Sequence, residues 1–187
     1  TSIAFLRAYG AEGIPHAFIV DKSGSVVWHG HPMDRLEDAL DRVLAGTMDP
    51  KLEAEMRELL PLWAMEYMVL AKYGRDTAEA DRVGEYLVAH GALMPDLLNR
   101  FVPYFFSQEG LAYRNTAFVA RVAKVAYDAA PGDAHTAELY ARALFENGQA
   151  AEAAALVKEV LPAAIGDSQL RSRLDAALEK YEAAAAG

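Results

Sequence analysis

The 187-residue chain contains no cysteine. Without a thiol, these residues alone cannot form disulfides, bind zinc or iron–sulfur clusters through thiolates, or use a cysteine as a nucleophile. Basic residues are also scarce: 18 Lys and Arg stand against 27 Asp and Glu, and the formal net charge is −9. Because an acidic surface repels a phosphate backbone, we expect no nucleic-acid partner.

Long hydrophobic runs are missing too. The most apolar stretch, residues 59–70, contains Pro61 and Glu66 and falls short of the ~18 apolar residues that a membrane helix needs. We therefore expect no membrane span. No signal peptide is recognisable, and the chain starts at Thr1 within a helical pattern, so we interpret it as a processed product or a fragment.

The sequence motifs of common active sites are absent as well. There is no Gly-x-Ser-x-Gly elbow and no Gly-rich phosphate loop, and the carboxylates have the spacing of solvated helix faces. We therefore assign no catalytic residue, no metal ligand and no cofactor to this chain.

The N-terminal part has the pattern of a β-hairpin between helices. Residues 2–9 look like the end of an amphipathic helix. Two short apolar runs, 16–21 and 25–29, flank a Gly-containing turn and predict a hairpin. A helix follows from Asp34, with Glu37 completing a capping box, and it ends before Gly46.

Everything after residue 49 has the pattern of helices joined by short loops, which is typical of antiparallel helical hairpins. We place a domain boundary at 47–49, dividing the chain into 1–47 and 48–187. The predicted helices cover 50–73, 76–90, 95–107, 115–130, 133–147, 150–161 and 167–186, with Pro61 expected to kink or split the first.

One helical pair has the small-residue spacing of a tetratricopeptide (TPR) unit. Ala141, Leu144, Gly148 and Ala153 fit that spacing, with Ala137 and Tyr140 ahead of them. Only one such unit can be recognised in the sequence, so an irregular helical bundle is the alternative. The aromatic residues between 101 and 113 are interpreted as core, with a peptide-binding groove as the minority reading.

The segment AYGAEGIPHAFIVDKSGSVVWHGHPMDRLEDALDRVLAG resembles the C-terminal half of a thioredoxin fold, closest to the TlpA-like or redoxin branch. The matching order is helix end, Gly-Ile-Pro, strand, Asp-Lys-x-Gly turn, strand, Gly-His-Pro and final helix. The helical part resembles a C-terminal extension of some of these proteins, in Leu98-Asn99, Glu109-Gly110-Leu111, Arg114-Asn115 and the run 140–145. Together these imply an α+β, mostly α chain: a partial thioredoxin-like fold followed by a TPR-like antiparallel helical domain.

The resemblance assigns a substrate-binding role to Ile14, Pro15 and His16. The Ile14–Pro15 bond would be the cis-proline bond of the family, Ile14 would offer backbone hydrogen bonds to an extended peptide, and His16 would border the active site. The alternative is a trans-proline that merely starts an edge strand.

Three histidines, His16, His29 and His31, lie within sixteen residues of one another. With Asp34 nearby they could form a metal site, but we favour ordinary strand-end and loop histidines, because the family motif already contains Gly-His-Pro.

The implied parent function is thiol–disulfide oxidoreduction on protein substrates, in an extracytoplasmic compartment. The cysteine motif would precede Thr1, and the helices would bind or orient a protein partner. The alternative is a non-enzymatic TPR-like interaction module with a degenerate thioredoxin-like fold. Because half a sheet exposes a strand edge, a homodimer through that edge is a further hypothesis.

Overall fold

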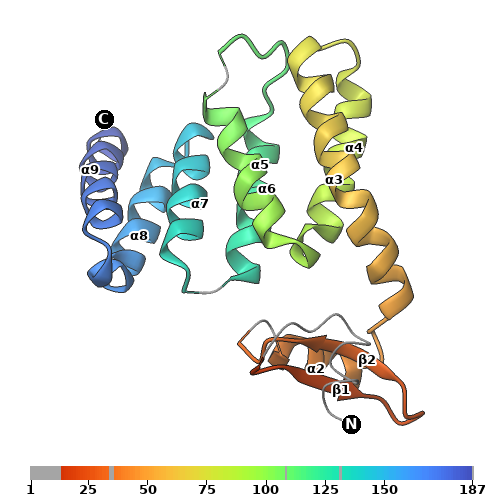
Figure 1. Cartoon of the computed structure of the whole chain (residues 1–187). Helices are drawn as coiled ribbons and strands as arrows, with labels where there is room; N and C mark the ends of the chain where they lie inside the picture. The colour runs from red at the N-terminus through yellow and green to blue at the C-terminus, as the bar shows by residue number, and fades with distance from the viewer. Residues whose placement is uncertain (1–13, 34–35, 108, 131, 187) are drawn as a thin grey trace. The chain divides into compact units, whose positions relative to one another are not determined.

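The computed structural model describes residues 14–33, 36–107, 109–130 and 132–186 (Figure 1). Within these ranges the chain is mostly helical, with one two-stranded antiparallel sheet and eight α-helices, which confirms the mixed, mostly α composition. It divides into two compact units, Thr1–Glu55 and Met56–Gly187. The predicted helix end at 2–9 and the Asp34 cap lie outside the described residues.

The first unit contains the predicted hairpin. Strand β1, Ala17–Val20, pairs antiparallel with β2, Val26–Gly30, and Phe18 lies opposite His29. The Asp21 carboxylate holds the turn by accepting the backbone N–H groups of Ser23 and Ser25 at 2.8 and 2.9 Å. The pKa of Asp21 is lowered, first by the hydrogen bond from the Ser23 hydroxyl and then by that from the Ser25 N–H.

The hairpin carries one helix, α2, Leu36–Leu44, which contacts β2. The apolar core of this unit is small: among its described residues only Ile19 and Ala39 are buried hydrophobics. Arg42 of α2 forms an ion pair with Glu53 at the start of the next helix.

Helix α3, Pro50–Tyr73, runs without a break through Pro61, so the chain is not split there. The division between the two units falls after Glu55, within α3, whereas the loop 47–49 predicted as a boundary lies between α2 and α3. Gly74, at φ +59°, ends the helix. The N–H of Tyr113 then covers its C-terminus by donating to the Ala71 carbonyl at 2.9 Å.

The remaining helices begin and end within one or two residues of the predicted bounds. The side-chain caps at Asp76, Asn115, Asp133 and Asp167 each accept a backbone N–H of the following helix. The helices are α4 (Thr77–His90), α5 (Pro95–Ser107), α6 (Thr116–Ala129), α7 (Ala134–Glu146), α8 (Ala150–Val160) and α9 (Ser168–Ala185), with 3₁₀ segments η1 (Gly91–Leu93) and η2 (Leu161–Gly166).

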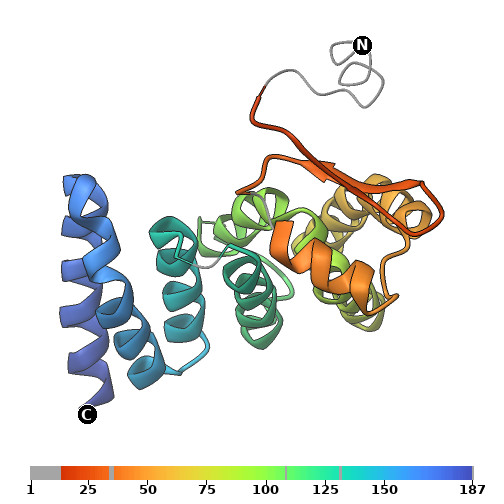
Figure 2. The ribbon, with the colours of Figure 1, turned by 90° about the horizontal axis from the view of Figure 1, so that it is seen from below.

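Helices α5 to α9 pack with a two-helix repeat. Helix α5 contacts α6 and α7, and α7 contacts α8 and α9. Figures 1 and 2 show α7, α8 and α9 following one another side by side. A polar bridge joins alternate helices, because Asn99 of α5 donates from Nδ2 to the buried Thr136 hydroxyl of α7 at 2.9 Å.

Two apolar clusters fill the second unit. One centres on Tyr67, Phe101, Phe105 and Phe118, whose rings contact one another across α3, α5 and α6. The other joins α7, α8 and α9 and contains the small residues of the predicted repeat unit, Ala137, Ala141, Leu144 and Ala153. Tyr140 contacts both clusters.

Among the described helices, none combines the length and the apolarity that crossing a membrane requires.

Candidate functional site

The predicted substrate-binding residues lie directly before β1. The Ile14–Pro15 peptide bond is cis, as the resemblance implies, and not trans. The Ile14 side chain is 86% exposed, and Pro15 is exposed too, whereas His16 is half-buried. An apolar side chain this open, next to the start of a strand, is available for contact with another chain.

His16 belongs to an aromatic cluster on one face of the hairpin. Its ring centroid lies 5.0 Å from that of Phe18 and 5.4 Å from that of His29. The Nε2 atom of His16 is 3.2 Å from Nδ1 of His29, so one imidazole donates and the other accepts. This contact fixes the His16 ring beside β1 and was not anticipated from the sequence.

The third histidine makes a different contact. Nδ1 of His31 accepts the backbone N–H of Met33 at 3.2 Å. In the described part of the chain, no group of three or more His, Cys, Asp or Glu side chains has the geometry of a metal site.

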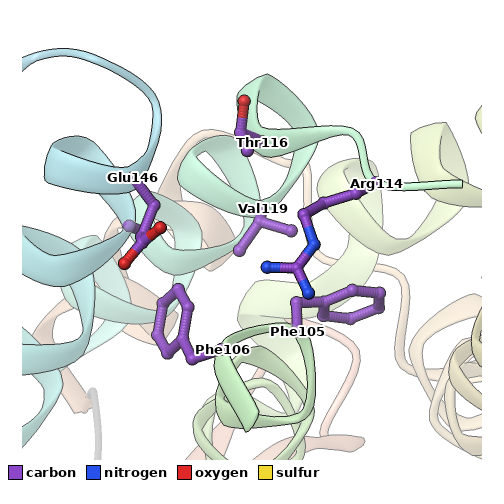
Figure 3. A pocket seen from close by; sticks show the side chains of 7 residues that line it. Phe105, Phe106, Arg114, Thr116, Val119 and Glu146 are labelled. Carbon is purple, nitrogen blue, oxygen red and sulfur yellow. The ribbon is translucent and has the colours of Figure 1, made fainter. Parts of the chain in front are cut away.

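A second candidate site is a pocket in the helical unit, between the ends of α5 and α7 and the start of α6 (Figure 3). Phe105 and Phe106 of α5 and Val119 of α6 form its apolar walls. Arg114, from the loop before α6, and Glu146, at the end of α7, extend toward it from opposite sides. Its volume is about 10 Å³, which is room for one water molecule.

A cation and a carboxylate flank this aromatic pocket, and a second guanidinium lies near it. The Arg142 guanidinium carbon is 4.4 Å from the centroid of the Phe106 ring. Such a rim suits a polar group or a peptide carbonyl. The sequence indicated the aromatic residues as core, and Phe101 and Phe105 are indeed buried. The sequence did not indicate that Arg114 and Glu146 share a pocket, because 32 residues separate them and no local pattern links them.

Neither site has a thiol group, since the chain has no cysteine. What the two sites offer is binding: an open apolar residue before a strand, and a charged rim over aromatic rings. Comparison of the chain with protein-family models, curated proteins and solved structures found no match.

Proposed function

We propose that this chain is the substrate-binding and partner-binding part of a thioredoxin-like thiol–disulfide oxidoreductase that acts on protein substrates. The redox cysteines lie outside these 187 residues, and the protein works in an extracytoplasmic compartment, where protein disulfides persist. Residues Ile14, Pro15 and His16 receive an extended peptide, and helices α3 to α9 bind or orient a protein partner.

The observation that carries this proposal is the exposure of Ile14 and Pro15 shortly before β1. Strand β1 itself pairs with β2. The open side chain of Ile14 comes three residues before β1 begins. The backbone groups of Ile14 can bind an extended segment by hydrogen bonds, while its apolar side chain selects among segments.

The first experiment uses the full-length gene product, including the residues that precede Thr1. We expect a Cys-x-x-Cys motif there and reduction of a disulfide-bonded test protein. Ile14→Asp should lower kcat/KM for that substrate about tenfold, since a charge would be desolvated against the bound segment. Met33→Asp is the matched control, because Met33 is 85% exposed on the same unit. Equal effects of both substitutions would contradict the assigned role of Ile14.

The two-helix repeat of α5 to α9 supports a second candidate, a non-enzymatic interaction module. In repeat arrays, alternate helices line a continuous surface that binds partners. If the full-length protein has no cysteine pair and no reductase activity, this alternative holds. Cross-links from a bound partner should then map to α5 and α7, near Arg142, and not to the hairpin.

A further inference from the structure

Helix α3 has an apolar stripe on the face that points away from the core of the helical unit. Leu62, Met65, Val69 and Tyr73 are 58%, 60%, 51% and 56% exposed. Their spacings of three, four and four residues place them on one side of the helix. We call these four residues the α3 stripe. The opposite side of α3, formed by Leu60, Ala64, Tyr67 and Ala71, is buried in the first apolar cluster.

Charges of opposite sign lie at equal distances on either side of Met65. Glu58 lies seven residues before Met65, and Lys72 lies seven residues after it, so all three have the heptad spacing of one helix face. Both charged side chains are exposed, and neither forms an ion pair with another residue in the described ranges.

We propose that the α3 stripe is a dimer interface, in which two copies of this chain pair antiparallel about a twofold axis at Met65. This arrangement places Glu58 against Lys72 of the second copy, and Lys72 against the second copy's Glu58. Leu62 packs against Val69 of the other helix on both sides of the axis. A twofold interface must be complementary to itself, and the Glu58–Lys72 and Leu62–Val69 pairs meet that requirement.

The same charges oppose other pairings. A parallel pair of α3 helices would set Glu58 against Glu58 and Lys72 against Lys72, and like charges across a helix pair are destabilising. A shallow hollow next to the stripe, lined by Val69, Leu70, Tyr73 and Arg75, adds a second cation near the site where the partner's Glu58 arrives. The stripe is short, so the dimer is expected to be weak and concentration-dependent.

The first test is sedimentation velocity of the whole chain over a wide concentration range. The wild-type chain should pass from monomer to dimer as its concentration rises. Met65→Glu should raise the dimer dissociation constant about a hundredfold, since it puts two carboxylates at the twofold axis. Ile165→Glu is the control, because Ile165 is 76% exposed on η2, away from the stripe, and should leave the constant unchanged.

The second test is a charge exchange that distinguishes an antiparallel α3 pair from any other dimer. Glu58→Lys and Lys72→Glu should each weaken the dimer about tenfold, and the combined variant should restore the wild-type constant, since opposite charges meet again. These effects should shrink at high salt. A chain that stays monomeric, a dimer indifferent to Met65→Glu, or a combined variant that is not restored would each overturn the proposal.

Discussion

At the scale of single residues, Tyr67 is the largest fully buried side chain among the described residues. Its side chain is 1% exposed and its ring contacts Phe101, Phe105 and Phe118. The hydroxyl is buried with no hydrogen-bond partner among the described residues. Burial raises the pKa of Tyr67 well above its usual value of 10.0, with smaller contributions from Tyr113 and Asp81.

This burial predicts a loss of stability in alkaline solution. Below pH 10 the phenol is protonated in both folded and unfolded chains, so pH has no effect through this group. Above pH 10 only the unfolded chain ionises, and the free energy of unfolding should fall by up to about 1.4 kcal/mol per pH unit from Tyr67. Urea unfolding between pH 8 and 11.5 measures it. Tyr67→Phe should give a shallower fall, whereas Tyr73→Phe, at an exposed residue, should match the wild-type profile.

Gly84 tests how closely α4 packs against its neighbours. A Cβ atom there would lie 2.8 Å from a ring carbon of Phe118 and 3.1 Å from one of Tyr67. We expect Gly84→Ala to lower the free energy of unfolding by about 1–3 kcal/mol, despite the better helix propensity of alanine. Gly166→Ala is the matched control, since nothing lies within 4 Å of its Cβ position. Equal urea midpoints for the two variants would refute this close packing.

Asn115 shows what can be predicted at this scale. Its role as a helix cap follows from its side chain and its place before an apolar periodic segment. Its amide also donates to Asp81 at 3.1 Å and to the Tyr113 hydroxyl at 3.2 Å. Asp81 is 34 residues away, and no local pattern links residues so distant. The predicted hairpin brings His16 and His29 to the same end of the sheet, but the sequence pattern does not show that their rings meet.

At the scale of elements, Asn115 ties α4 to the beginning of α6. Its Oδ1 accepts the Phe118 N–H at 2.9 Å, while its Nδ2 holds Asp81 of α4. We expect Asn115→Ala to cost about 2 kcal/mol, since it removes both the cap and the bridge. Asn115→Ser keeps a capping oxygen and should recover about half of that loss. Urea unfolding by circular dichroism measures both losses. Full recovery in Asn115→Ser would show that the bridge contributes nothing, and equal losses would show that the cap contributes nothing.

Helix ends were predictable because capping side chains, glycines and prolines act within a few residues. The 3₁₀ segments η1 (Gly91–Leu93) and η2 (Leu161–Gly166) were not predicted. They follow α4 and α8 directly, and no residue pattern there distinguishes a 3₁₀ turn from a loop. The apolar residues of α3 also left open which face is buried, because the helix is apolar on two sides. Only the aromatic rings of α5 and α6 decide that Tyr67 faces inward.

At the scale of the whole molecule, the two compact units have very different cores. The hairpin unit has two buried hydrophobic residues in its described part, whereas the helical unit has two extended clusters. Since stability follows apolar burial, the hairpin unit should unfold first. The division of the chain into 1–47 and 48–187 stays a prediction that unfolding can examine.

The chain offers a natural probe for this difference, because it has two tryptophans, Trp28 in β2 and Trp63 in α3. In thermal unfolding, the Trp63→Phe variant reports on the hairpin unit and Trp28→Phe on the helical unit. We expect the Trp28 fluorescence transition to have the lower midpoint. Coincident transitions in the two variants would mean that the units unfold as one.

The row of helices from α5 to α9 has a mechanical consequence. Helix α9 is held by α8, with smaller contacts to α7 and η2, and the aromatic cluster around Tyr67 lies beyond α7. A force applied at the C-terminus would therefore peel α9 away, then α8, while the ring cluster stayed closed. A chain built in this way yields gradually from one end, and the loss of its terminal helices opens the second apolar cluster before the first.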